Sequence, residues 1–253
     1  MLSLSPSKIT TFLECPFKYE CDCDTETRKK YKRESAPLVF GNLIHGTLND
    51  YFKRTAKEAR SMQRLRDLFK EKFNKNLAKH ERIFGDKKTI TEYVLRARAM
   101  FENFMNGEFA SVEPFITEEF PRYHLNPDLE LSGKYDRIDN LDGQLTVVDY
   151  KTGKIREEAI DSFQLDFYEL LLGYIYPDFS VKRKVFYFLD ENQVTEIPVK
   201  GEDVIGIKER ILEVADKIRL TKEFKPKQND TCRFCDYQPI CPLMKKGVAS
   251  NNG

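Results

Sequence analysis

The spacing of hydrophobic residues divides the chain into a mainly helical first part and a later part with short strands. Up to Gly107, apolar residues recur at intervals of three and four, as on helices with one buried face. After Gly107, short apolar runs and alternating residues predict strands. This order predicts an α/β or α+β sheet covered by helices.

Two helices are expected near the start of the chain. Ser5 is a plausible N-cap and Pro6 fits the first helical position, so a short helix should follow and reach Cys15-Pro16. A second helix should begin near Val39, where apolar residues again have helical spacing.

The charged segment 55–107 also has apolar residues at helical spacing. It predicts two or more helices with a break near Gly85-Asp86, the second running from Thr91 to Met105.

Three strands are expected next, over Phe115–Tyr123, Leu129–Asp139 and Gln144–Lys151. Asp142-Gly143 is a strong hairpin signal between the last two. The remaining pattern predicts a helix over 157–175, strands over 181–189 and 194–199, and a helix over 203–220.

The charge balance neither demands nor excludes a nucleic-acid ligand. The chain has 42 basic and 41 acidic residues and a net charge of +1, so it is not a strongly basic protein. The basic cluster Arg28–Arg33 is a solvated helix face or a phosphate contact. The apolar runs fall short of the roughly 18 residues of a membrane span, and the first residues lack the pattern of a secretory signal, so we expect a cytoplasmic protein without a membrane partner.

Two acids and a lysine form the clearest chemical pattern. Antiparallel pairing around Asp142-Gly143 places Asp136 opposite Asp149, and the pleat puts Lys151 on the same face as Asp149. Carboxylates bind Mg²⁺ or Mn²⁺, and a nearby lysine can orient water or offset developing charge during phosphodiester hydrolysis. The alternative is an ordinary hairpin with surface charges.

The neighbouring residues extend this pattern. Gly133 and Gly153 flank the acids, where a close approach of the backbone would admit a ligand. Gln164 and Tyr168 share a helix face, from which they could contact a bound strand or hold Lys151.

These motifs resemble those of a known family. Gly133-Lys-Tyr-Asp136-Arg-Ile-Asp, Val148-Asp149-Tyr-Lys151-Thr-Gly and Gln164-Leu-Asp-Phe-Tyr168 are similar to the PD-(D/E)XK nuclease superfamily. The nearest pattern is its RecB/AddB-type branch, which includes the iron–sulfur exonucleases of CRISPR adaptation. The resemblance covers residues 1–20, 38–52 and about 115–245.

The resemblance implies further site residues. Gly41-Asn-Leu-Ile-His45 matches the branch's Gly-x-x-x-His motif, so His45 and the backbone carbonyl of Tyr150 are expected to bind the metal together with both acids. An additional acid often precedes the first aspartate; we expect Glu119, with Glu118 as the alternative.

Six cysteines lie near the two ends of the chain. In a cytosolic protein, such grouping favours metal binding over disulfides. Cys232, Cys235 and Cys241 form one group and Cys15 is the natural fourth ligand, although Cys21 could compete with it and Cys23 is expected to be free. Spacing alone does not separate a structural Zn²⁺ from a [4Fe–4S] cluster.

The resemblance favours the iron–sulfur cluster, which would join residues 1–24 to residues 225–245. It thus implies one nuclease domain over 1–245 with a PD-(D/E)XK core and a mixed central sheet flanked by helices. The resemblance does not cover the helical segment, which we expect to be an insertion over about 53–107. Residues 246–253 are expected to form a flexible tail.

The leading functional hypothesis is a metal-dependent DNA exonuclease acting on single-stranded ends, with 5′-to-3′ digestion favoured by the resemblance. It would serve recombination, repair or CRISPR adaptation, with a helicase or integrase-like protein as a possible partner. The alternatives are a non-catalytic DNA-binding or assembly module with a structural cluster, and a structure-specific endonuclease on the same fold.

Overall fold

The computed structural model describes residues 1–155, 161–199 and 203–244. These residues group into two compact units. Unit 1 holds residues 1–33, 124–131 and those from 206 onward, and unit 2 holds residues 34–123 and 132–205. The predicted tail 246–253 and residues 157–160 of a predicted helix lie outside the described residues.

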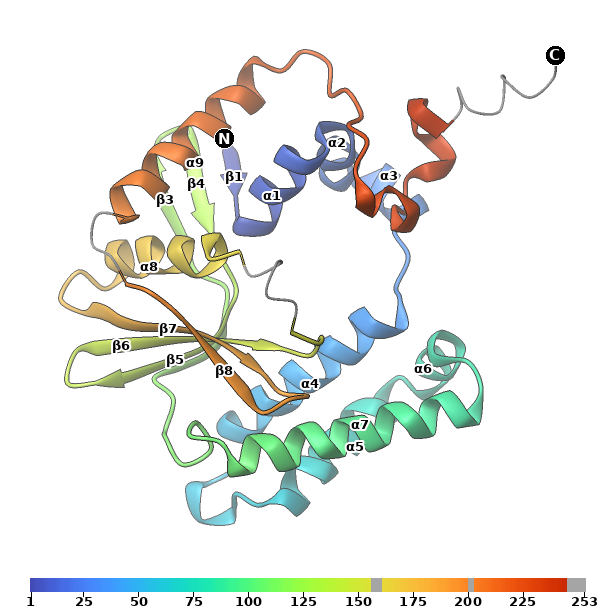
Figure 1. The fold of residues 1–253 in the computed structure, drawn as a ribbon, viewed down its shortest axis with the longest axis vertical. Coiled ribbons are helices and arrows are strands. Elements are labelled where there is room, and N and C mark those ends of the chain that lie inside the picture. Colours follow the sequence, from blue (N-terminus) through green and yellow to red (C-terminus); the bar gives the residue numbers. More distant parts are fainter. Residues whose placement is uncertain (156–160, 200–202, 245–253) are drawn as a thin grey trace. The chain divides into compact units, whose positions relative to one another are not determined.

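Unit 2 is built on a five-stranded mixed sheet with the order β2-β5-β6-β7-β8 (Figure 1). Neighbouring strands are antiparallel except β6 and β7, which are parallel. Helix α8 (Phe163–Ile175) lies between these two strands in the sequence, as expected for a parallel crossover. The strands are β2 Ile116–Glu119, β5 Tyr135–Leu141, β6 Gln144–Lys151, β7 Ser180–Phe188 and β8 Gln193–Ile197.

The hairpin between β5 and β6 forms where the sequence predicts it. Asp142 and Gly143 have φ values of 49° and 81°, the positive angles that a two-residue hairpin turn requires. The pairing runs from Leu141 with Gln144 to Arg137 with Val148, which is the predicted register. Asp136 and Asp149 are the next residues beyond the last pair.

Two predicted strands are each divided in the structure. The segment 115–123 forms β2 and the start of β3 (Arg122–Asn126), and Leu129–Asp139 forms β4 (Leu129–Ser132) and β5. The interruptions contain Pro121 and Gly133, residues that weaken a continuous strand. At both points the chain passes from one sheet to another, since β3 and β4 pair in a separate sheet with β1.

Helices cover both faces of the five-stranded sheet (Figure 1). Helix α8 lies along one face, and α4 with α5 and α7 lies on the other. The break predicted near Gly85-Asp86 is confirmed: Gly85 has a φ of 86° and Asp86 caps α7. The helices are α4 Ala36–Lys53, α5 Met62–Lys75, α6 Leu77–Phe84 and α7 Lys87–Asn106, with a 3-10 turn η1 at Lys57–Ala59.

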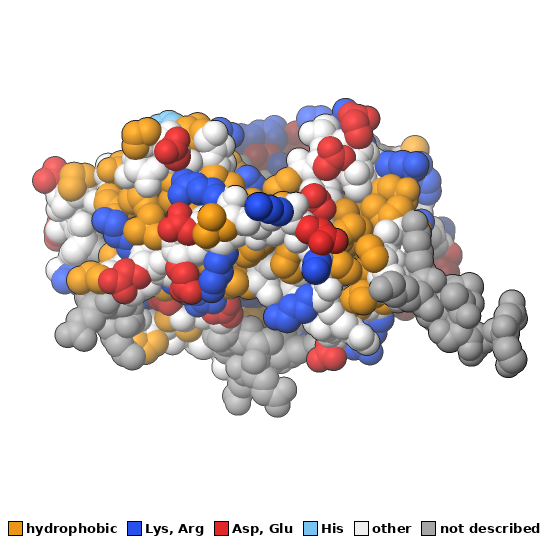
Figure 2. All heavy atoms as spheres, turned by 90° about the horizontal axis from the view of Figure 1, so that it is seen from above, with side chains coloured by type: hydrophobic (Ala, Val, Ile, Leu, Met, Phe, Trp, Pro, Cys, Tyr) orange, Lys and Arg blue, Asp and Glu red, His pale blue; other side chains and the backbone are white. Residues whose placement is uncertain are grey.

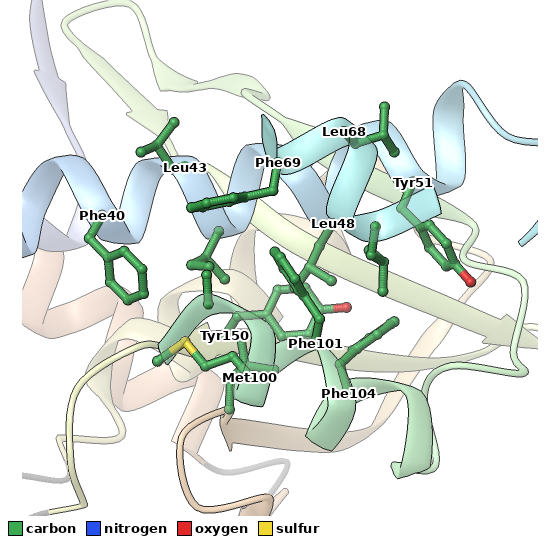
Figure 3. Close-up of a cluster of buried hydrophobic side chains, with 14 of the residues drawn as sticks. Phe40, Leu43, Leu48, Tyr51, Leu68, Phe69, Met100, Phe101, Phe104 and Tyr150 are labelled. Atoms are coloured by element: carbon green, nitrogen blue, oxygen red, sulfur yellow. The ribbon is translucent and has the colours of Figure 1, made fainter. Parts of the chain in front are cut away.

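The main core of unit 2 lies between these helices and the sheet. Figure 3 shows aromatic and aliphatic side chains of α4, α5 and α7 meeting Tyr150 of β6. Phe40 and Phe104 are fully buried there. Burying such side chains contributes about 1.5–3 kcal/mol each, so the helical segment 62–106 is part of the scaffold that supports β6.

Unit 1 contains the first helices and the C-terminal segment. Ser5 caps α1 as predicted, accepting a hydrogen bond from the Lys8 amide at 3.3 Å. Helix α2 was not predicted, whereas α3 contains the start of the basic cluster Arg28–Arg33, for which a helix face was one of two interpretations. Its elements are β1 Leu2–Leu4, α1 Pro6–Glu14, α2 Pro16–Cys23, α3 Thr25–Tyr31, most of β3 and β4, nearly all of α9 Asp203–Leu220, and the 3-10 turns η3 Asp230–Phe234 and η4 Gln238–Ile240.

Within the described ranges, no helix has both the length and the apolar character needed to cross a membrane. On the face drawn in Figure 2, basic and acidic side chains are interspersed. This mixture agrees with the balanced net charge of the chain.

Candidate active site

Two buried carboxylates lie where strands β5 and β6 end their pairing. Asp136 is 9% exposed and Asp149 is 4% exposed. Burial and the negative charge of Asp136 together raise the pKa of Asp149 to about 6, although Lys151 partly offsets both effects. Two partly repelling carboxylates in one buried place form a site that a cation would stabilise.

Asp136 is held from two elements. His45 of α4 contacts its Oδ1 through Nδ1 at 2.8 Å, and the backbone amide of Tyr150 donates to its Oδ2 at 3.0 Å. Burial disfavours the charged imidazole, but the hydrogen bond and charge of Asp136, with the charge of Asp149, outweigh it and raise the pKa of His45. The predicted group of His45, Asp136 and Asp149 is therefore brought together.

Lys151 and Gln164 complete a connected set with Asp149. Lys151 Nζ lies 2.6 Å from Asp149 Oδ2 and donates to Gln164 Oε1 at 3.0 Å. Gln164 Nε2 donates to Asp149 Oδ1 at 2.6 Å. The amide of Gln164 thus fixes the carboxylate and the ammonium together, as in one of the two roles considered for it.

Tyr168 supports this set from one helical turn further along α8. It is buried, receives a hydrogen bond from Gln164 at 3.2 Å and donates to the Lys134 carbonyl at 2.8 Å. A Cβ on Gly133 would lie 2.9 Å from the Tyr168 ring. Gly133 therefore permits close packing of α8, a different reason from the ligand access expected for it.

The two candidates for the additional acid, Glu118 and Glu119, lie in different surroundings. Glu119 is exposed and pairs with Tyr135 across the strands. Glu118 falls opposite Asp136 in the same register, and its Oε1 accepts from Lys134 Nζ at 2.9 Å. Glu118 also has a φ of 42°, a conformation unusual for a non-glycine residue that recurs at functional sites.

Arg96 is a further residue that supports the candidate site, and only tertiary contacts reveal it. Arg96 of α7 bonds the carboxylate of Asp190 and the backbone carbonyl of Thr152, the residue that follows Lys151. A Cβ on Gly41 would lie 3.2 Å from Thr152 Oγ1. No local signal in the sequence indicates Arg96, because its partners are more than 50 residues away along the chain.

Arg137 is a second support that the sequence did not reveal. It is fully buried, donates to Asp139 Oδ1 at 2.7 Å and binds the carbonyls of Phe109 and Val112 at 2.8 Å each. It therefore ties β5 to the connection between α7 and β2.

The donor set fits a divalent cation chemically. Carboxylate oxygens are the ligands that Mg²⁺ and Mn²⁺ prefer, and imidazole is compatible with Mn²⁺. As they stand, the His45–Asp136 and Asp149–Lys151 contacts occupy these donors, and within the described residues no three His, Cys, Asp or Glu side chains have the arrangement of a metal site. Binding a cation at the two acids would require these contacts to rearrange.

All six cysteines lie within or directly beside helix α2 or the turns η3 and η4 of unit 1, and all six are free. Cys15 and Cys21 are buried. Burial, together with smaller electrostatic effects of the nearby Glu20, Asp22, Cys235 and Cys15, raises the pKa of Cys21 to about 12. The pKa of Cys235 is also raised by burial, and Cys15 and Cys232 contribute.

Backbone amides point at two of these sulfurs. The amide of Lys227 donates to Cys15 Sγ at 3.5 Å, and that of Asn229 donates to Cys232 Sγ at 3.4 Å. Asn229 Nδ2 also binds the carbonyl of Glu14 at 3.1 Å. The segment 227–235 is therefore in contact with the end of α1, and Cys21 as well as Cys15 lies near it.

Comparisons with known proteins place this geometry in a family. The sequence profile of the PD-(D/E)XK nuclease superfamily matches residues 3–242. The Gene 69 protein of Mycobacterium phage D29 is 28% identical over 135 residues, which are 49% of this chain and 49% of the phage protein. The Gene 69 protein of Mycobacterium phage L5 is 29% identical over 123 residues, which are 46% of this chain and 41% of that protein. The matched region thus spans about half or less of the length of these curated relatives.

A similar fold is found in the crystal structure of a candidate exonuclease from Eubacterium rectale. The superposition includes 98% of this chain and 93% of the Eubacterium rectale chain, with a TM-score of 0.57 and 13% sequence identity. At this identity the likeness concerns the fold alone. The expected α/β architecture, a mixed sheet flanked by helices, is confirmed.

Proposed function

The chain belongs to the PD-(D/E)XK nuclease superfamily, and we propose that it hydrolyses phosphodiester bonds of DNA with the help of Mg²⁺ or Mn²⁺. Nucleases of this superfamily typically use these ions. The observation that carries the proposal is the bonded set of Asp149, Lys151 and Gln164 next to Asp136, which His45 contacts.

Each residue has a role in the proposed reaction. Asp136, Asp149, His45 and the Tyr150 carbonyl would hold the cation, with Glu118 or Glu119 as an additional acid. When bound, the cation would polarise the phosphate and favour deprotonation of water. Lys151 Nζ would orient the attacking water and offset the negative charge that develops on the phosphate.

Gln164 and Tyr168 would act mainly as positioning residues. Gln164 already bonds both Asp149 and Lys151, and the Tyr168 hydroxyl is engaged with Gln164 and Lys134. A DNA strand would then contact the half-buried side chains of Lys151 and Gln164 rather than the buried Tyr168 hydroxyl.

We further propose exonuclease action on single-stranded DNA ends, with 5′-to-3′ digestion favoured. The resemblance to the RecB/AddB-type branch supports it. The same resemblance supports a role in recombination, repair or CRISPR adaptation with a helicase or integrase-like partner.

Cys15, Cys232, Cys235 and Cys241 would bind a [4Fe–4S] cluster, with structural Zn²⁺ as the alternative. Their fit rests on free, clustered thiols and on the amide donors to Cys15 and Cys232. Cys21 competes for a ligand position because it is buried near Cys15 and Cys235. Iron, sulfide and zinc analysis of anaerobically purified protein decides the metal.

One assay tests the nuclease proposal. Labelled linear and circular single strands, duplex DNA and RNA are incubated with Mg²⁺ or Mn²⁺, and with Asp149→Ala and Lys151→Ala variants. Digestion of linear strands only, lost in both variants, supports an exonuclease. Cleavage of circles would indicate the endonuclease alternative, and binding without cleavage the non-catalytic module. Variants as active as the parent would place the reaction elsewhere.

A further inference from the structure

An exposed aromatic ring lies in the connection between β2 and β3. Phe120 is 57% exposed. The guanidinium of Arg122 lies 5.9 Å from the centre of its ring, at the limit of a cation–π contact. The pair presents an aromatic face with a cation beside it.

Phe120 differs from the other exposed phenylalanine of this segment. Phe115 packs against Tyr176 and Phe179, with ring centres 5.6 and 5.7 Å away. Among the described residues, Phe120 has Arg122 as its one ring or cation partner. Local packing therefore accounts for Phe115 and leaves the ring of Phe120 available.

The strand register connects Phe120 to the candidate active site. Glu119 pairs with Tyr135, so Phe120 falls opposite Lys134 at the next position. The amide of Gly133 donates to the Pro121 carbonyl at 3.2 Å, which holds the two segments together. The carbonyl of Lys134 accepts from Tyr168, whose hydroxyl meets Gln164.

The charges around this ring suit a phosphodiester backbone. Arg122 is exposed, and the Lys134 side chain is 49% exposed. The Lys134 ammonium donates to Glu118 Oε1 at 2.9 Å, and Glu118 falls opposite Asp136 in the strand register, so this cation lies close to the acids. An aromatic ring beside cations is the arrangement by which proteins stack an unpaired base and follow its backbone.

We propose that Phe120 and Arg122 form a nucleobase-stacking subsite for single-stranded DNA beside the carboxylate site. The ring takes the face of an unpaired base, and Arg122 and Lys134 face the adjoining phosphates. A base within a duplex has its faces stacked on neighbouring bases, so this subsite selects strands whose ends are unpaired. The inference rests on the proposed nuclease function and specifies its substrate.

The test compares Phe120→Ala, Phe120→Trp and Leu141→Ala with the parent. Leu141 is also an exposed apolar residue, at the opposite end of β5, so it controls for loss of surface hydrophobicity. Fluorescence anisotropy with a labelled single strand in a chelator measures binding without cleavage, and steady-state assays with Mg²⁺ or Mn²⁺ measure kcat and KM.

Phe120→Ala is expected to weaken single-strand binding about tenfold and to raise KM similarly with little change in kcat. Phe120→Trp and Leu141→Ala should remain close to the parent, and duplex binding should not change. Scanning the strand with single abasic positions should show one position that weakens parent binding but has no effect on Phe120→Ala.

Three outcomes would overturn the subsite. Parent-like single-strand binding by Phe120→Ala in an active nuclease removes the subsite and leaves the nuclease proposal intact. A change of oligomeric state in sedimentation, with DNA binding unaltered, makes Phe120 a protein contact instead. If the parent cleaves no DNA at all, the nuclease proposal itself fails, and the subsite fails with it.

Discussion

The carboxylate site of unit 2 and the cysteine region of unit 1 are held in different ways. Asp149 is joined to its neighbours by bonds of 2.6 Å and lies on a strand supported by a large core. The cysteines lie on short helices and 3-10 turns, where free thiols are contacted by backbone amides. Packing against a large core therefore positions the first site, whereas the cysteine region is held by short elements and by contacts between thiols and backbone amides.

Loss of a carboxylate tests the first half of this comparison. Asp149→Ala should reduce the cleavage rate about ten-thousandfold, because a ligand and the partner of Lys151 are lost together. Thermal unfolding should stay close to that of the parent, since the substitution also removes a buried charge. Single-turnover cleavage measures the rate, with exposed Asp178→Ala as the matched control. A variant that cleaves normally would remove Asp149 from the site.

The scaffold behind the carboxylate site provides the next test. Lys184 of β7 is fully buried and binds Asp166 at 2.6 Å and Glu169 at 2.5 Å, both on the helix that carries Gln164. Lys184→Met should lower the free energy of unfolding by about 3–5 kcal/mol, because two buried carboxylates lose their cation. Denaturant unfolding measures it.

The control for that test lies on the same strand. Lys182 is exposed, so Lys182→Met should change the free energy of unfolding by less than about 0.5 kcal/mol. Equal effects of the two substitutions would show that the buried ion pairs do not hold α8.

Substitution of a proposed metal ligand in the cysteine region should reduce both the metal content and the stability of the protein. Cys235→Ser should remove bound iron or zinc and lower stability by about 2 kcal/mol, roughly 5 °C in Tm, because metal binding contributes folding free energy. Metal analysis and thermal unfolding with and without a chelator measure both effects. The exposed Cys23→Ser is the control. Full metal content in Cys235→Ser would exclude Cys235 as a ligand.

The smallest effect is expected for substitution of Gln164, the residue that bonds both Asp149 and Lys151. Gln164→Ala should lower kcat about 10- to 100-fold with little change in KM, because Lys151 and Asp149 lose the amide that orients both. Gln164→Glu keeps the side-chain length but cannot donate to Asp149, so it should not restore the rate. A change confined to KM would instead indicate that Gln164 binds the DNA strand.

Local sequence signals determined much of the fold and the centre of the candidate site. Asp142-Gly143 determined the hairpin turn, and the turn set the strand register in which Asp136 falls opposite Asp149. Ser5, Gly85 and Asp86 marked helix ends, because capping and turn residues act on their immediate neighbours. These features need only a few adjacent residues, so they can be recognised without the tertiary structure.

Other features were decided only when distant segments met. The division of the predicted strands at Pro121 and Gly133 follows from a change of sheet, which the alternating pattern does not record. The bonds of Arg96 to Thr152 and Asp190, the burial of Lys184 beside α8, and the packing of Gly133 on Tyr168 join residues far apart in sequence. Their signal is a contact rather than a local preference, and only the tertiary structure contains it.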